Sequence, residues 1–261
     1  MSYEIPLTKA ISWNAAKEIN ALLAGARSQG KSWLGMYLTM TLAKLNPSTQ
    51  IFVIDYKKSD FSRLAPLLPN GRVASDKEDI FELLENFNQL LQDRIEYFNE
   101  NFGFGEDAMS IGMPLFYLVY DEFGAFTSEL VTKEKQLHDK LIGKIALLGR
   151  QYNFGLIAIM QQASVGNSGL SSAVKEQFGL IAHMGSATPS AYRLTFKEDI
   201  DFQENRQFER GTGQLWLQGS FSPRTTIPFA APLLAKENLY KDFAEAFAYQ
   251  DTQTALFYSR R

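Results

Sequence analysis

The sequence contains no cysteine, and this absence excludes disulfides, thiolate zinc sites and catalysis by a cysteine nucleophile. Only two histidines are present, His138 and His183, so a histidine-rich metal site is not expected. Long hydrophobic runs are also missing, because Met113 to Tyr120 is far shorter than the roughly 20 apolar residues of a membrane-crossing helix. The first ten residues include charged residues and a proline, unlike a signal peptide. These absences predict a cytoplasmic location, with recruitment to a membrane left open.

The chain also lacks a basic excess. Its 26 Lys and Arg residues are outnumbered by 29 Asp and Glu residues, which gives a formal net charge of −3. Nucleic-acid-binding proteins usually carry a positive charge, so the composition alone does not favour that class. The acidic residues are concentrated between positions 76 and 100, however, and the rest of the chain has a small positive excess. A local basic surface therefore remains compatible with the composition.

What the sequence does contain is enough apolar material for one large folded domain, with 45% hydrophobic residues in a chain of 261. Short apolar runs alternate with longer segments of helical periodicity, which is typical of an α/β fold with a mostly parallel central sheet flanked by helices. Most of these runs are apolar throughout, as strands buried on both faces should be. The expected strands are Ala21 to Ala24, Gln50 to Ile54, Leu115 to Tyr120, Gly155 to Met160, Gly179 to His183 and Gln214 to Leu217.

Apolar residues at helical spacing predict a long amphipathic helix from Ile80 to Phe98 and a second helix from Leu137 to Leu148. We expect both apolar stripes to pack against the core rather than to bind a cofactor. A third helical run, Trp33 to Lys44, follows the first expected strand after a short loop. This strand, loop and helix form the context in which phosphate-binding loops are found.

A phosphate-binding loop is predicted here because residues 25–32 match the spacing G-x-x-x-x-G-K-[ST]. The glycines let backbone amides turn toward phosphate oxygens, and the following helix adds its positive N-terminal end. Lys31 is expected to neutralise the β- and γ-phosphates, and the Ser32 hydroxyl to bind Mg²⁺. ATP and Mg²⁺ are therefore the expected cofactors. The predicted nucleotide-binding residues are Gly25, Ala26, Arg27, Ser28, Gln29, Gly30, Lys31, Ser32 and Trp33.

Two carboxylates follow another apolar strand and supply an acidic partner for this loop. Asp121, directly after Leu115 to Tyr120, is expected to hold Mg²⁺ through water, and Glu122 to polarise the attacking water. An enzyme that transfers phosphate to another substrate would not need the second carboxylate to activate water, so its presence favours hydrolysis. Gln161 ends a further strand and is a candidate sensor of the γ-phosphate.

Together these motifs resemble the FtsK/SpoIIIE branch of the HerA-like P-loop ATPases, in order from about residue 20 to about residue 230. The phosphate loop at residues 25–32 corresponds to Walker A of this branch, and the strand that ends in Asp121-Glu122 corresponds to Walker B. The resemblance also involves an Asp-Pro-Lys-like turn, a Gly-Arg-x-x-Gly-like turn, a strand ending in Gln-Arg-Pro and a closing Gly-x-Gly strand. The Gln-Arg-Pro pattern has lost its Arg and Pro here. The matching segments are Asp55-Tyr56-Lys57-Lys58, Asp121-Glu122-Phe123, Gly149 to Gly155, Gln161-Gln162-Ala163 and Gly211 to Trp216.

Within this branch the chain is most similar to FtsK-like DNA coupling proteins of Gram-positive conjugative elements. Leu148 to Phe154, Lys175 to Gly185 and the Lys-Ser-Asp-Phe stretch within 57–61 carry this likeness. It implies a lead-in segment at 1–20, a RecA-like motor domain at 21–232 and a helical C-terminal segment at 233–261. The membrane helices and winged-helix domain of full-length relatives are missing from the chain, so it is either a motor-domain fragment or a small stand-alone relative.

The resemblance also implies a homo-oligomeric ring, usually a hexamer, with ATP sites between subunits. Such a ring needs an arginine that acts on the neighbouring subunit's nucleotide. Arg150 matches this role best, and Arg193 and Arg224 are alternatives. A relaxase or a membrane channel is a candidate further partner.

Loops facing the pore of such a ring are expected to contact DNA phosphates without reading base sequence, and the DNA is expected to be duplex. Lys57, Lys58 and Arg63 are the predicted DNA-binding residues, and Gly166 to Ser172 forms a second candidate loop. A few charges per subunit suffice because each subunit repeats them, so the net acidity is no objection.

The leading functional hypothesis is an ATP-hydrolysing DNA translocase that acts in conjugative transfer or in the processing of mobile-element or plasmid DNA. One alternative is an ATPase of protein export, similar to those of type VII secretion. Export modules of this branch often have degenerate acidic motifs, and the intact Asp121-Glu122 favours the DNA motor. A second alternative is a nucleotide-gated assembly module that does not depend on turnover.

Overall fold

The computed structural model describes residues 3–46, 48–161, 169–220, 222–250 and 252–257. In these residues the centre of the protein is an eight-stranded sheet with the order β10-β9-β8-β3-β7-β6-β4-β5. The strands from β8 to β5 run parallel, whereas β9 pairs antiparallel with both of its neighbours, β8 and β10. The strands are β3 (Asn20–Gly25), β4 (Gln50–Asp55), β5 (Val73–Ala74), β6 (Phe116–Asp121), β7 (Phe154–Ile159), β8 (Phe178–Met184), β9 (Thr212–Leu217) and β10 (Ile227–Ala230). The expected α/β fold with a mostly parallel sheet is confirmed.

The six expected strands are present, with ends that differ by a residue or two. The sequence pattern did not reveal β5 and β10, which are short edge strands, or a separate hairpin made of β1 (Glu4–Pro6) and β2 (Ser12–Asn14). Short strands carry too few residues for a period of two to stand out. The central strands were visible because β3, β4, β6 and β7 are buried at every position.

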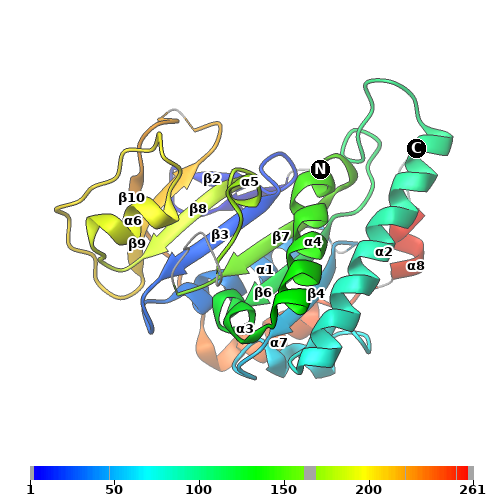
Figure 1. The fold of residues 1–261 in the computed structure, drawn as a ribbon, viewed down its shortest axis with the longest axis horizontal. Coiled ribbons are helices and arrows are strands. Elements are labelled where there is room, and N and C mark those ends of the chain that lie inside the picture. Colours follow the sequence, from blue (N-terminus) through cyan, green and yellow to red (C-terminus); the bar gives the residue numbers. More distant parts are fainter. Residues whose placement is uncertain (1–2, 47, 162–168, 221, 251, 258–261) are drawn as a thin grey trace.

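Helices cover both faces of the sheet (Figure 1). On one face, α2 (Lys77–Asn101) and α4 (Thr132–Leu148) run side by side and bury the apolar stripes that the sequence predicted. On the other face, α1 (Lys31–Leu45) packs against α7 (Leu239–Ala246). The remaining helices are α3 (Phe123–Glu129), α5 (Ser172–Lys175), α6 (Pro189–Thr195) and α8 (Thr252–Phe257), with short 3₁₀ turns η1 (Ser62–Leu67), η2 (Gly149–Tyr152) and η3 (Lys236–Asn238).

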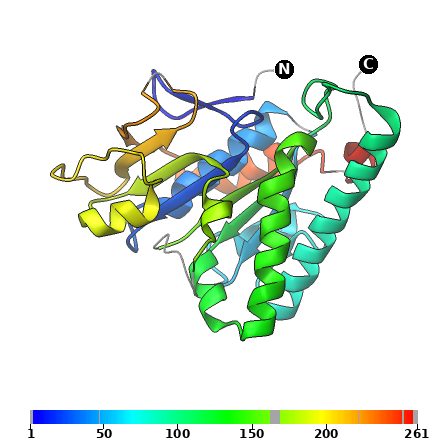
Figure 2. The same ribbon diagram turned by 45° about the horizontal axis from the view of Figure 1, so that its top comes forward.

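Both ends of the described chain pack onto this core. The first hairpin buries Ile5 and Trp13 completely, and the Tyr117 hydroxyl on β6 donates to the Ala15 carbonyl at 2.5 Å. At the other end, α8 lies against α2, as Figures 1 and 2 show. No helix in the described ranges combines the length and apolar character that crossing a bilayer requires.

One buried arginine joins α8 to the rest of the molecule. The guanidinium of Arg94, on α2, is fully buried and donates to four backbone carbonyls, at 2.8–3.1 Å. It also lies over the rings of Phe116 and Phe154 at 4.5 and 5.0 Å. The carbonyls belong to Pro114, Tyr152, Ala255 and Leu256. The planar fork of arginine suits this geometry, which a lysine could not reproduce.

Candidate nucleotide site

The predicted phosphate loop connects β3 to α1 at the carboxyl edge of the parallel strands, near the middle of the sheet. Its backbone has left-handed conformations at Gly25 (φ 137°), Ser28 (φ 62°) and Gly30 (φ 103°). A Cβ atom at Gly25 would lie 2.3 Å from the Met184 carbonyl oxygen of the neighbouring strand β8. Glycine is therefore needed at this position both for its φ angle and for the close approach of two backbones.

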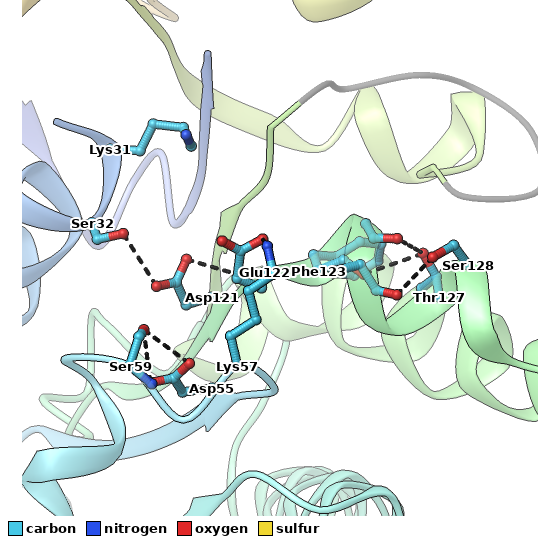
Figure 3. A network of polar contacts seen from close by, with 12 residues as sticks. Lys31, Ser32, Asp55, Lys57, Ser59, Asp121, Glu122, Phe123, Thr127 and Ser128 are labelled. Atoms are coloured by element: carbon cyan, nitrogen blue, oxygen red, sulfur yellow. Dashed lines mark hydrogen bonds and ion pairs between the residues drawn. The ribbon is translucent and has the colours of Figure 1, made fainter. Parts of the chain in front are cut away.

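Lys31 and Ser32 begin α1 directly behind this loop. The Lys31 ammonium donates to the Ala26 carbonyl at 2.8 Å, and the residue is only 8% exposed. Burial lowers the pKa of Lys31, and the negative charges of Glu122 and Asp121 act in the opposite direction. The lysine is thus held between the loop and two carboxylates (Figure 3), where a cation would meet the terminal phosphates of a nucleotide.

Asp121 ends β6 and is the acidic partner that the sequence predicted for the loop. Its carboxylate accepts a hydrogen bond from the Ser32 hydroxyl at 3.2 Å and one from the Glu122 amide at 2.9 Å. Burial raises the pKa of Asp121 to about 7, and the neighbouring charges of Asp55 and Glu122 add to this effect. The hydrogen bonds from Glu122 and Ser32 oppose it.

This donor set fits a magnesium ion. A hydroxyl and a carboxylate oxygen are ligands that Mg²⁺ accepts, and a cation beside Asp121 would offset three neighbouring negative charges. Within the described part of the chain, no cluster of three or more His, Cys, Asp or Glu residues could hold a metal. Mg²⁺ usually keeps several waters and takes further oxygens from phosphates, so Ser32 and Asp121 suffice as its protein ligands.

Glu122 follows Asp121 in a left-handed backbone conformation, with φ 57° and ψ 34°. Non-glycine residues adopt this conformation only where the surrounding structure imposes it, because it costs roughly 1–3 kcal/mol. The next residue, Phe123, is buried and begins α3, so the chain turns sharply at Glu122. The turn leaves the Glu122 side chain partly exposed, and its Oε2 lies 2.7 Å from the Lys57 ammonium.

A third carboxylate, Asp55, ends β4 beside Asp121 and shapes the loop that carries Lys57. Asp55 is fully buried and accepts hydrogen bonds from the amides of Ser59 (2.7 Å) and Ser62 (2.9 Å) and from the Ser59 hydroxyl. Its carboxylate is occupied by this loop, whereas that of Asp121 faces the phosphate loop (Figure 3). The two aspartates thus have different partners although they end adjacent strands.

Each of the three predicted DNA-binding residues has an acidic partner. Lys57 pairs with Glu122, as described above. Lys58 pairs with Asp76 at 2.8 Å, and Arg63 lies 3.6 Å from Asp60, both on exposed surface. In the second candidate loop, residues 166–168 lie outside the described residues.

Gln161 follows β7, which lies between β3 and β6, so the structure brings this residue to the edge where the loop and Asp121 lie. It is exposed, and the adjoining Gln162 and Ala163 lie outside the described residues. Arg150, by contrast, precedes β7 in η2 and is exposed at the opposite edge of the sheet. Six residues of strand span about 20 Å, so Arg150 is remote from the phosphate loop of its own chain.

The two alternative arginines lie elsewhere. Arg193, on α6, is largely exposed and faces Glu204 at 3.5 Å. Arg224 is exposed in the connection between β9 and β10.

Sequence reasoning missed the side of the site built by β8 and β9. Gly185 packs against the Gln29 side chain, and the Gly211 amide donates to the Gln29 carbonyl at 3.0 Å. His183 is buried on β8, and burial lowers its pKa to about 4, with a further contribution from the Lys31 charge. The glycines were a visible signal, but which loop they support depends on the order of the strands.

Comparison with known proteins supports the resemblance found in the motifs. No protein-family model matches the chain. The chain is 24% identical over 234 residues to the FtsK domain-containing protein YdcQ of Bacillus subtilis (strain 168). This match covers 89% of the chain but 47% of YdcQ, so the chain spans about half the length of that relative.

Among solved structures, the chain is similar to the pCW3 conjugation coupling protein TcpA in its monomer form with ATPgS, with a TM-score of 0.73, 13% identity and coverage of 93% of this chain and 70% of TcpA. It is also similar to EssC (ATPases 2 and 3) of Geobacillus thermodenitrificans, with a TM-score of 0.71, 12% identity and coverage of 98% and 49%. The cytoplasmic domain of the Thermomonospora curvata type VII secretion ATPase EccC is similar with a TM-score of 0.67 and 17% identity, and the match covers 95% of this chain and 31% of EccC. These likenesses show that the chain shares the fold of ATPase domains, and together with the match to the FtsK domain-containing protein YdcQ they bear out the resemblance to the FtsK/SpoIIIE branch.

Proposed function

We propose that this chain, which resembles FtsK/SpoIIIE-type ATPases over most of its length, hydrolyses ATP and uses the cycle to move DNA through a homo-oligomeric ring. The observation that carries the hydrolytic part is the meeting of Ser32 and Asp121 at 3.2 Å, with Glu122 next in the chain. This arrangement supports the proposal of a cation site and a base beside one phosphate-binding loop. A binding module would need the loop but not the second carboxylate.

In the proposed reaction the loop amides and Lys31 bind the ATP phosphates. Ser32 and Asp121 hold Mg²⁺, which supplies charge neutralisation on the phosphate oxygens when bound. Glu122 orients a water molecule and accepts its proton as the water oxygen attacks the γ-phosphorus. The bond from that phosphorus to the β–γ bridging oxygen breaks, and ADP and phosphate are formed. Gln161 is positioned at the same edge to contact the γ-phosphate.

Arg150 is proposed to act on the nucleotide of a neighbouring subunit. Its place at the edge of the sheet opposite the phosphate loop supports this role, because it cannot reach the nucleotide of its own chain. An arginine supplied in this way stabilises charge that develops on the transferred phosphoryl group. The role requires a ring in which η2 of one subunit, the turn that carries Arg150, meets the phosphate loop of the next subunit.

DNA is proposed as the polymer that the ring moves. Lys57 and the exposed Lys58 lie on the loop that follows the carboxyl end of β4, and the exposed Arg63 lies in η1 directly after this loop. The similarity to a conjugation coupling protein supports a role in DNA transfer. Repetition of this loop around a ring would multiply its phosphate contacts without sequence preference.

Protein export remains the second candidate. The type VII secretion ATPases EssC and EccC have TM-scores close to that of the conjugation protein. The fold is therefore compatible with either proposed function, and the polymer that stimulates hydrolysis would distinguish DNA transfer from protein export.

The deciding experiment is steady-state ATP hydrolysis at low salt, with and without long duplex DNA, for the unaltered chain and for Lys31→Ala and Glu122→Gln. Strong stimulation by DNA that is lost in both variants, and that falls as salt rises, supports the DNA motor. Stimulation by a secreted peptide but not by DNA would move the assignment to protein export. Hydrolysis that survives Glu122→Gln would overturn the proposed catalytic role of that residue.

A further inference from the structure

Lys57 joins the predicted DNA loop directly to the proposed catalytic base. Its ammonium lies 2.7 Å from Oε2 of Glu122 (Figure 3). While this ion pair is formed, one Glu122 oxygen is therefore directed at Lys57 and is not free to take a proton from water.

The backbones on both sides of this pair are held in place. Glu122 occupies a left-handed turn between buried Asp121 and buried Phe123, which limits where its side chain can point. On the other side, Asp55 binds the amides of Ser59 and Ser62 and fastens the base of the Lys57 loop. The long side chain of Lys57 is consequently the adjustable part of the contact.

The pair is also accessible from solvent. The Lys57 side chain is 37% exposed and that of Glu122 is 21% exposed. Ion pairs with this much water access contribute little to stability, so another anion can replace the carboxylate at low cost. A phosphate oxygen makes the same charge-assisted hydrogen bond with an ammonium group.

The neighbouring cations of the loop are not connected to the catalytic residues. Lys58 pairs with Asp76, and Arg63 lies beside Asp60, and neither aspartate is at the nucleotide site. Among these three cations, Lys57 is the one whose partner is the base.

We propose that Lys57 is a positioning residue that restrains Glu122 in the absence of DNA and releases it when a DNA phosphate takes over the Lys57 ammonium. The inference rests on the proposed function, because it names DNA as the polyanion. Lys57 thus pairs either with Glu122 or with a DNA phosphate, and pairing with the phosphate frees Glu122. This exchange makes ATP hydrolysis fast mainly when DNA is bound.

The test compares Lys57→Met, Lys57→Arg and Lys77→Met with the unaltered 261-residue chain in ATP hydrolysis, first without DNA and then across a titration of long duplex DNA. Lys77 is the matched control because it forms a similar half-exposed pair, 2.5 Å from Glu134, that involves none of the proposed catalytic residues. An exposed ion pair shifts an equilibrium by up to about fivefold. We therefore expect Lys57→Met to raise the DNA-free rate by about two- to fivefold and to reduce the stimulation ratio toward one.

The conservative Lys57→Arg keeps the positive charge and should retain both a low DNA-free rate and the response to DNA. Lys77→Met should behave as the unaltered chain. Thermal melting verifies that each variant is folded, and Lys57→Gln serves as a second neutral variant. A structural role of Lys57 alone would lower activity in the neutral variants, whereas the proposed restraint predicts a gain.

If DNA stimulates the unaltered chain but neutral Lys57 variants keep or lower the DNA-free rate, the restraint is overturned and the DNA motor stands. If DNA does not stimulate the unaltered chain, the proposed function is overturned together with the DNA-driven release. The two failures are therefore distinguishable in one data set.

Discussion

Asp55 and Asp121 end adjacent parallel strands in register, so two buried carboxylates lie next to each other at the carboxyl edge of the sheet. Backbone amides of the following loop bind Asp55, while the Ser32 hydroxyl binds Asp121. The first carboxylate holds a loop and the second holds the proposed cation. The loop that carries Lys57, which is proposed to contact the polymer, is thus joined to the nucleotide site through neighbouring strand ends.

Gly25→Ala is expected to destabilise the protein. The new Cβ would lie 2.3 Å from the Met184 carbonyl oxygen, and a φ of 137° is unfavourable for alanine. Together these effects should cost at least about 2 kcal/mol, which lowers the melting temperature by roughly 4–8 °C. The control is Gly143→Ala in α4, where nothing lies within 4 Å of the added Cβ. That change should stabilise the helix by up to about 1 kcal/mol, and equal melting temperatures for the two variants would contradict the expected clash at Gly25.

Arg150→Ala is expected to abolish hydrolysis while leaving ATP affinity nearly unchanged. The reason is that Arg150 lies at the sheet edge opposite its own phosphate loop, and in the proposed ring it would act on a neighbour's nucleotide. Mixing Arg150→Ala with Lys31→Ala should restore part of the activity, because some interfaces would then combine an intact loop with an intact arginine. The readout is ATP hydrolysis as a function of mixing ratio. If each mixture hydrolyses ATP only at the summed rate of its two variants, Arg150 does not act on a neighbour's nucleotide. The same test would then be applied to Arg193 and Arg224.

Protonation of His183 is expected to reduce stability at acidic pH. Burial lowers the pKa of His183 to about 4 in the folded protein, whereas about 6.5 is usual for an exposed histidine. The unfolded chain therefore binds the proton more readily, and stability is lost as the pH falls from about 6.5 toward 4. The full shift corresponds to about 3 kcal/mol. Urea unfolding at several pH values should show a smaller acid-induced loss of unfolding free energy for His183→Gln than for the unaltered protein. The same dependence of unfolding free energy on pH in both proteins would refute this assignment.

Replacement of Arg94 is expected to be among the most destabilising single changes on α2. Arg94→Ala leaves four buried carbonyls without their donor and removes the contact with α8. A loss of about 3–5 kcal/mol is expected, or roughly 6–20 °C in melting temperature. The exposed Lys241→Ala on α7 is the control and should change stability by less than about 0.5 kcal/mol. Limited proteolysis should cut the α8 region of the Arg94 variant first, and a wild-type cleavage pattern would show that α8 is held by other contacts.

Much of the architecture could be predicted because it depends on local patterns. The strands around the loop were visible as continuous apolar runs, and the stripes from Ile80 to Phe98 and from Leu137 to Leu148 predicted α2 and α4. The first hairpin was not visible, since β1 and β2 have three residues each and gain their burial from packing on distant Tyr117 and its neighbours. Strands this short have no local signal of their own.

The amino-acid sequence by itself determined the phosphate loop from Gly25 to Ser32 and the pair Asp121-Glu122, because their chemistry depends on residue types at fixed spacing along one stretch of chain. Only the tertiary structure decided which groups meet. The partnership of Lys57 with Glu122, the adjacency of Asp55 and Asp121, and the separation of Arg150 from its own phosphate loop all follow from the order of strands in the sheet. That order differs from the order along the chain, and it is set by the burial of whole strand and helix faces rather than by any local motif.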